Sequence, residues 1–549
     1  MPLKSLYVSA IFLLTCLSTN AQQPTVNINV AEIPVLYNKE HKNPRMRFKV
    51  LNSAIRDNTK MTRPFAEELV EFGEAKYLAL KPLIMDQNIP TIQKHIRDKK
   101  LTYKDLVTFY IYRIDKIEND PELTLNAIIS LNPDVIREAE LKDSLRKNQK
   151  NPDFIYGMPI LLKDNIGFDG LPTTAGAAAL INNNTKDAFI VKKLKEKGAI
   201  ILGKTNLSEW AYYFCSGCPL GYSAVGGQSL NPYGRMRFET GGSSSGSGTA
   251  VAANYAVAAV GTETSGSILS PSSLNSVTGF KPTVGLLSRT GIVPISSTLD
   301  TPGPMTKNVI DNAILMDAMT GADPEDTQTN LNSGRISYYK TIKKASLKGQ
   351  RFGVFKHLIE FPDYVKFSNI LRSQGAEIIE LDSQNGTLQG FLTLLNMDMK
   401  SDLPAYLSKY ASAHVTFRSI EDIISYNTEV LSIRAPYGQA LFEGIVKDTT
   451  SETSFKKIKD DLETSGKSYF ESLMNSNKLD AVLSINNMHA AIAAVAKYPC
   501  LTIPMGYKSD GEPHGITLIG PSGTEAKLYQ LAYKLEEKTK IRKVPANYD

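Results

Sequence analysis

The chain has 549 residues, of which 42% are hydrophobic and 21% are charged, an ordinary composition for a globular protein. Its 62 basic and 56 acidic residues leave a formal net charge of +6. So small a charge over this length gives no sign of a nucleic-acid or membrane-surface partner. The length permits several domains or one large α/β domain.

The first 21 residues have the pattern of a secretory signal peptide. Lys4 precedes an apolar run from Leu6 to Leu17, and small residues close the segment at Ala21. We expect cleavage after Ala21 and export to the periplasm or the medium, with an uncleaved anchor as the alternative. No later apolar run reaches about 18 residues, so no stable membrane insertion is expected.

The next part of the chain is polar and then helical. Residues 22–88 contain several prolines and no clear period, and we interpret them as an N-terminal extension. Residues 88–120 predict two helices, with Thr102 as the cap of the second. Residues 125–133 predict a short strand and turn, followed by an exposed helix over 134–150.

Strands and helices alternate from about residue 155. Residues 157–166, "GMPILLKDNI", predict a buried strand that leads into a polar loop, and a helix and a second buried strand follow up to Lys204. Residues 335–475 are more polar and helical. Three strand-like runs and a helix over 525–539 close the chain. The pattern predicts one large α/β domain over residues 89–545, a sheet covered by helices.

Three cysteines remain beyond the signal peptide: Cys215, Cys218 and Cys500. The Cys-x-x-Cys pair is compatible with a disulfide, with half of a metal site, or with neither. Zinc would need two more ligands, and no further His or Cys pair lies nearby. The odd count argues against a disulfide framework, so the pairing stays open.

The serine-glycine stretch "GGSSSGSG", residues 241–248, admits several interpretations. A phosphate loop would need a lysine after its last glycine, which is missing. The pattern G-x-S-x-G makes Ser244 a candidate nucleophile, but no buried strand precedes it, and His489 and His514 have no adjacent acid. A linker or helix cap is the remaining simple interpretation. The small apolar residues around the stretch indicate that it is packed.

A lysine can replace histidine as the base that activates a serine, provided that its amine is neutral. Burial lowers a lysine pKa because it destabilises the ammonium. Lys163 stands at the end of the predicted buried strand and is the candidate. The alternative is a strand-end lysine whose amine reaches water.

Six blocks with fixed spacing lie within roughly residues 90–540. They are "GMPILLKDNI" (157–166), "GAIILGKTNLSEW" (198–210), "GGSSSGSGTAVAA" (241–253), "GTETSGSILSPSSLNSVTGFKPT" (261–283), "DTPGPMTKNV" (300–309) and, near the C-terminus, "YPCLTIPMGY…GEPHGITLIG" (498–520). These blocks resemble the amidase signature family, and the peptide-amidase-like bacterial subgroup is the most similar.

The resemblance implies a Ser-Ser-Lys triad. Ser267 is then the nucleophile, Ser243, 24 residues earlier, the bridging serine in a cis peptide after Gly242, and Lys163 the base. The implied oxyanion hole consists of backbone N–H groups, those of Thr264, Ser265, Gly266 and Ser267. The implied fold is a single domain with a mixed central sheet covered by helices on both faces. No metal and no nucleotide cofactor is implied.

The chain departs from the family pattern at two positions next to the nucleophile. Ser265 stands where the family often has glycine, and Leu269 where it often has arginine. These changes leave the triad intact but make the pocket hard to predict. The signal peptide argues against an amidotransferase subunit, which works on charged tRNA in the cytosol.

We therefore expect an amide hydrolase that forms an acyl-enzyme, acts on small or peptide amides, and is a monomer or homodimer. No nucleic-acid partner is expected. Two alternatives remain, a catalytically inactive binding protein with the amidase fold and a Ser-His-Asp esterase that uses Ser244.

Overall fold

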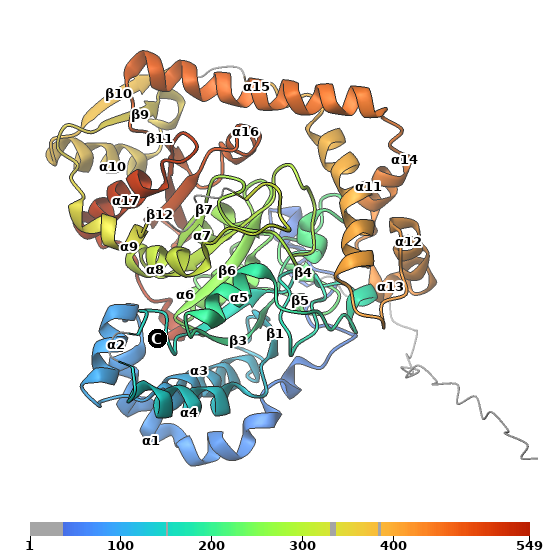
Figure 1. Cartoon of the computed structure of the whole chain (residues 1–549), viewed down its shortest axis with the longest axis vertical. Coiled ribbons are helices and arrows are strands. Elements are labelled where there is room, and N and C mark those ends of the chain that lie inside the picture. Colours follow the sequence, from blue (N-terminus) through green and yellow to red (C-terminus); the bar gives the residue numbers. More distant parts are fainter. Residues whose placement is uncertain (1–36, 150–151, 330–335, 383–385) are drawn as a thin grey trace, which may run out of the picture. The chain divides into compact units, whose positions relative to one another are not determined.

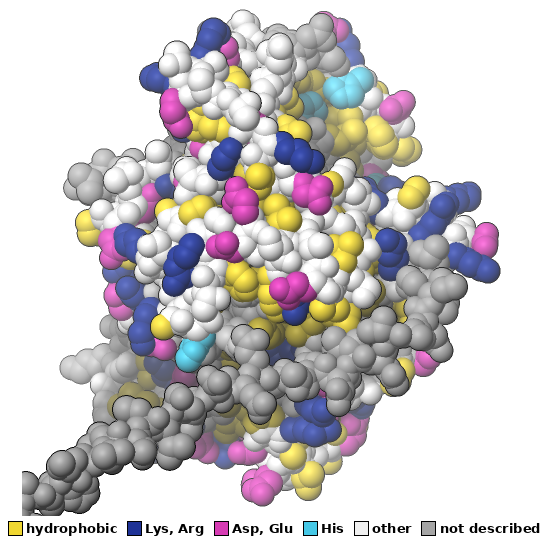
Figure 2. All heavy atoms as spheres, turned by 90° about the vertical axis from the view of Figure 1, so that its right-hand side faces the viewer, with side chains coloured by type: hydrophobic (Ala, Val, Ile, Leu, Met, Phe, Trp, Pro, Cys, Tyr) yellow, Lys and Arg dark blue, Asp and Glu magenta, His cyan; other side chains and the backbone are white. Residues whose placement is uncertain are grey.

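The computed structural model describes residues 37–149, 152–329, 336–382 and 386–549 (Figure 1). The predicted signal peptide, residues 1–21, lies outside this part. None of the described helices is both long and apolar enough to cross a bilayer. On the face in Figure 2, basic and acidic side chains are interspersed.

A mixed sheet of 11 strands organises the described residues. β2 pairs in parallel with β3 and β6, whereas β6 pairs antiparallel with β8. The predicted α/β class with a mixed central sheet is thus confirmed. In spatial order the strands are β1 (Ile128–Leu131), β3 (Ile200–Thr205), β2 (Pro159–Lys163), β6 (Ala258–Glu263), β8 (Thr301–Thr306), β7 (Thr278–Lys281), β12 (Cys500–Tyr507), β13 (Pro513–Ile519), β11 (Ala481–Ile485), β9 (Arg351–Phe355) and β10 (Glu377–Leu381). β4 (Tyr222–Ser223) and β5 (Gly227–Gln228) form a separate pair.

Helices flank this sheet in two groups. In the first group, α6 (Ser245–Ala252) and α7 (Leu269–Leu274) contact each other and the central strands. In the second, α8 (Val309–Met319) contacts α5 (Phe189–Glu196) and α17 (Glu525–Thr539), and it also contacts the central strands β6, β7 and β8. The remaining α-helices are α1 (Ala66–Ile84), α2 (Ile89–Arg97), α3 (Tyr103–Glu118), α4 (Val135–Arg146), α9 (Tyr338–Thr341), α10 (Pro362–Ser373), α11 (Phe391–Lys409), α12 (Ile420–Glu429), α13 (Leu431–Arg434), α14 (Ala440–Lys447), α15 (Glu452–Asn477) and α16 (Ala490–Val495).

The region before residue 89 contains more order than its sequence suggests. Residues 66–84 form α1, which contacts α3, and apolar side chains of residues 37–88 join the same hydrophobic core as the sheet. Phe65, Phe72 and Ile84 are among them. The packing of α1 against α3 explains this helix, because its own apolar pattern is weak.

Local sequence patterns predicted most of the helices and strands correctly. Thr102 caps α3 through a capping box with Asp105, as its position predicts. The main omission lies in the polar region 335–475, where β9 and β10 pair in parallel around α10. β10 is an edge strand with four of its five residues at least partly exposed, so it lacks the buried apolar run used to find strands.

Candidate active site

Lys163 is the last residue of β2, between β3 and β6, and its side chain is fully buried. Its Nζ lies 2.7 Å from Ser243 Oγ, 2.7 Å from Thr262 Oγ1 and 3.2 Å from the Thr262 carbonyl oxygen. Thr262 belongs to the neighbouring strand β6. Sheet pairing therefore brings the lysine to its polar partners.

Burial lowers the pKa of Lys163 to about 7, against a smaller opposing effect of Asp300 and Glu263. At this pKa a large part of the amine is neutral at neutral pH. A neutral amine has two N–H donors and one lone pair. The donors match the two oxygens of Thr262, which leaves the lone pair for the hydroxyl of Ser243.

Ser243 is buried directly before α6. The Gly242–Ser243 peptide is cis, and the Ser243 carbonyl accepts the Ser208 N–H at 3.0 Å. A Cβ at Gly242 would lie 2.6 Å from Ser208 Oγ, so only glycine fits there. The whole of α6 is buried, which excludes the flexible-linker interpretation of the serine-glycine stretch.

Ser267 lies in the turn between β6 and α7, and 9% of it is exposed. Its carbonyl accepts the Ser244 N–H at 3.1 Å, which ties this turn to the segment of Ser243. Its hydroxyl has no hydrogen-bond partner in the described part of the chain, Ser243 included. The hydroxyl is thus available to an incoming group.

The four N–H groups of the predicted oxyanion hole differ in whether they already have a hydrogen-bond acceptor. The Gly266 N–H donates to Glu263 Oε1 at 2.7 Å, so this group is already occupied. The N–H groups of Thr264, Ser265 and Ser267 have no acceptor among the described residues. Three donors, rather than four, are therefore available to an oxyanion; a buried carboxylate, which the sequence did not reveal, takes the fourth.

Ser244 is arranged as a structural residue. Its hydroxyl donates to the Thr262 carbonyl at 3.0 Å and accepts the Thr262 N–H at 3.2 Å. His514 does have an acid partner, Asp363 at 2.7 Å, contrary to the sequence expectation, and His489 contacts Ser484. Neither histidine bonds Ser244, so the esterase alternative lacks its base.

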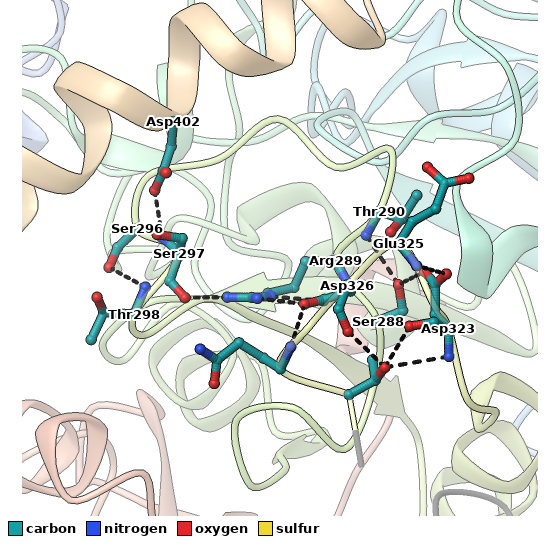
Figure 3. Close-up of polar contacts among 12 residues, drawn as sticks. Ser288, Arg289, Thr290, Ser296, Ser297, Thr298, Asp323, Glu325, Asp326 and Asp402 are labelled. Atoms are coloured by element: carbon teal, nitrogen blue, oxygen red, sulfur yellow. Dashed lines mark hydrogen bonds and ion pairs between the residues drawn. The ribbon is translucent and has the colours of Figure 1, made fainter. Parts of the chain in front are cut away.

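A cavity of about 290 Å³ adjoins this site. Thr262, Thr264 and Asn165 line one side of it, next to Lys163. Figure 3 shows other lining residues, among which Arg289 pairs with Asp326 and contacts the Ser297 carbonyl. The sequence did not predict these wall residues, because only the sheet brings their segments together.

The cysteines resolve an open question. Cys215 and Cys218 form a disulfide, and Cys500 is free and buried. Over the described residues, no group of three or more His, Cys, Asp or Glu side chains is placed to hold a metal ion.

A sequence profile of the family named Amidase matches residues 105–438. The chain belongs to the amidase family. It is an amidase-type hydrolase that acts on the C–N bonds of linear amides. The resemblance inferred from the sequence blocks is confirmed.

Known amidases match most of the chain. A probable amidase of Arabidopsis thaliana is 38% identical over 502 residues, which cover 87% of this chain and 95% of that protein. The structure of an amidase family protein from Bacillus anthracis has a TM-score of 0.85 at 35% identity and covers 90% of this chain and 99% of its own. Native peptide amidase from Stenotrophomonas maltophilia has a TM-score of 0.80 at 34% identity and covers 84% and 98%.

Amidotransferases also resemble this amidase. A glutamyl-tRNA(Gln) amidotransferase subunit from Alkaliphilus metalliredigens is 29% identical over 84% of this chain and 98% of that protein.

The two departures from the family pattern, Ser265 and Leu269, do not disturb the arrangement of Lys163 and Ser243, because both residues lie in the turn and helix after β6.

Proposed function

We propose that the chain is a serine amidase in which Ser267 is the nucleophile, Ser243 the proton relay and Lys163 the base. The observation that carries the proposal is the buried amine of Lys163, whose Nζ lies 2.7 Å from Ser243 Oγ. Its pKa of about 7 suits a general base at neutral pH.

The reaction proceeds in two halves. Ser267 Oγ attacks the amide carbon while its proton passes to Ser243, whose own proton passes to neutral Lys163. The N–H groups of Thr264, Ser265 and Ser267 stabilise the oxyanion, each by about 3 kcal/mol. The protonated Lys163 then returns the proton through Ser243 to the leaving nitrogen, the C–N bond breaks, and an acyl-enzyme ester remains.

Water completes the cycle. The same relay removes a proton from a water molecule, which attacks the ester and releases the carboxylic acid and free Ser267. The products are a carboxylate and ammonia or an amine. Lys163 is neutral at the beginning and at the end of each half-reaction, so the proton transfers balance without a cofactor.

We propose small carboxamides and C-terminal peptide amides as substrates. The likeness to peptide amidase supports this class, as does a cavity of about 290 Å³ with both apolar and charged walls. The predicted signal peptide supports export to the periplasm or the medium. Edman sequencing of protein recovered from the cell envelope and medium tests this: a mature chain that begins at Gln22 supports cleavage, whereas an intact N-terminus contradicts it.

Labelling by a fluorophosphonate and hydrolysis of an amide panel test the enzyme. Ser267→Ala should abolish both, and Lys163→Ala should remove most hydrolysis while the fold persists. Labelling that persists in Ser267→Ala would contradict the nucleophile. Ser244→Ala is the matched control on the adjacent segment: labelling lost only there would support the esterase alternative. Absence of both labelling and turnover in the mature wild-type protein would favour the inactive binding protein.

A further inference from the structure

Glu263 is a buried carboxylate at the C-terminal end of β6 that the reaction above does not use. Only 1% of the residue is exposed. It accepts the N–H groups of Gly266 at 2.7 Å, Ile268 at 2.7 Å and Leu269 at 3.0 Å. These residues lie on both sides of Ser267, so one side chain holds the whole turn that carries the nucleophile.

Such bonds constrain the backbone strongly. Hydrogen bonds from N–H groups to a carboxylate are roughly twice as strong as those between neutral groups. Because Gly266 has a positive φ of 84°, the turn also passes through a conformation that side chains rarely adopt. With the Gly266 N–H turned to Glu263, the N–H groups of Ser265 and Ser267 on either side are left unbonded within the described chain.

Asp300 holds the start of the same turn. Its Oδ1 accepts the hydroxyl of Thr264, and its Oδ2 accepts the N–H groups of Ile295 and Ser296 at 2.8 and 3.0 Å. Thr301, the next residue along the chain, pairs with Glu263 across β8 and β6. Glu263 therefore reaches the turn from the end of β6 and Asp300 from the residue directly before the neighbouring strand β8, and Asp300 also lines the cavity.

We propose that Glu263 and Asp300 are positioning residues of the amidase reaction, which fix the oxyanion donors and the nucleophile of the turn 264–269 and act on the base Lys163. This inference rests on the proposed function of Ser267 and Lys163. Neither carboxylate touches the reacting atoms: Glu263 acts through the backbone and Asp300 through Thr264.

The charges support a second effect of the pair. Asp300 and Glu263 are the charged groups that oppose the fall of the Lys163 pKa. The charge of Lys281 on β7 partly offsets the rise that burial gives to the pKa of the Glu263 carboxyl. Asp164, the residue after β2, and Lys204 on β3 form an ion pair with each other at 3.4 Å.

Glu263→Gln is the central test, and Glu118→Gln is its matched control. Glu118 is also buried and accepts two backbone N–H groups, those of Asn126 and Ala127, but it lies in α3, and its partners lie before β1. Glu263→Gln should lower kcat by about 100-fold with KM changed less than about threefold, the usual effect of a small misplacement. Glu118→Gln should leave kcat within about threefold.

The pH profile separates positioning from simple damage to the fold. Loss of either carboxylate should move the acid limb of kcat/KM to lower pH, by up to about one unit, because Lys163 loses a favourable charge. Asp300→Asn should move it in the same direction, and Glu118→Gln should not. Thermal melting of each variant verifies folding, and Asp300→Asn provides the measurement if Glu263→Gln does not fold.

Equal losses of kcat in Glu263→Gln and Glu118→Gln, or an acid limb that stays in place in both Glu263→Gln and Asp300→Asn, would overturn the inference. Its failure differs from failure of the proposed function. If the proposed function fails, wild-type protein shows no labelling at Ser267. If only the inference fails, wild-type protein is labelled and active, while Glu263→Gln loses no more activity than Glu118→Gln or the acid limb stays in place in both Glu263→Gln and Asp300→Asn.

Discussion

Lys163→Met should abolish activity and stabilise the fold, because burial holds the pKa of the lysine far below its ordinary value. Its pKa is about 7 in the folded chain, against an ordinary value of 10.5. At pH 7 the unfolded chain is protonated at this site, whereas the folded one is about half protonated. This difference costs the wild-type fold about 4 kcal/mol of folding free energy, a cost that the methionine variant does not have. The variant also loses the stabilisation of the two or three hydrogen bonds that methionine cannot make. A net gain of about 1–2 kcal/mol is expected.

The pH dependence gives the sharper measurement. Since the folded pKa lies below the unfolded one, the penalty is complete below about pH 7 and disappears as the pH rises toward 10.5. The free energy of unfolding is measured by chemical denaturation at pH 7 and pH 9. From pH 7 to pH 9, the value for the wild-type protein should rise by about 2 kcal/mol relative to the value for Lys163→Met. In parallel, wild-type kcat/KM should fall tenfold per pH unit below about pH 7. A stability difference that does not change with pH, or a rate that is flat down to pH 5, would refute this reasoning.

Three further predictions concern the surroundings of the site. Asp164→Asn leaves the buried Lys204 without its 3.4 Å partner and should cost about 3–5 kcal/mol in chemical denaturation; a loss below 1 kcal/mol would show that the pair is dispensable. Replacement of both Cys215 and Cys218 by serine opens a loop of only four residues and should cost about 2 kcal/mol or less, so a much larger fall in unfolding free energy would contradict the loop estimate. His514→Gln should leave fluorophosphonate labelling unchanged, because the ring is occupied by Asp363, and lost labelling would revive a histidine mechanism.

Local sequence patterns were sufficient for the elements that carry the site. Lys163 ends an apolar run, and this alone predicts a buried strand with a lysine at its end. The fixed-spacing blocks then predicted the roles of Ser243 and Ser267 through the family resemblance, and these roles stay predictions. These features depend on short segments, so a single sequence contains them.

The sequence did not predict several partners of the site residues, because these contacts depend on the folded structure. Thr262, which contacts Lys163 through two oxygens, is 99 residues away from it, and nothing local marks it as a partner. Asp363 lies 151 residues before His514, which explains why that histidine lacked an acid in the sequence. Glu263 stands three residues before Gly266, yet its hydrogen bond with the Gly266 N–H depends on a turn that the sequence alone does not specify.

The pairing of β2 with β6 makes activity a reporter of chain topology. Lys163 reaches Ser243 and Thr262 only after two strands separated by nearly a hundred residues lie side by side. Helices can form earlier from local interactions, whereas such distant pairing is slow. During refolding, recovered hydrolysis would therefore time the closure of the central sheet, and circular dichroism would time the helices that precede it.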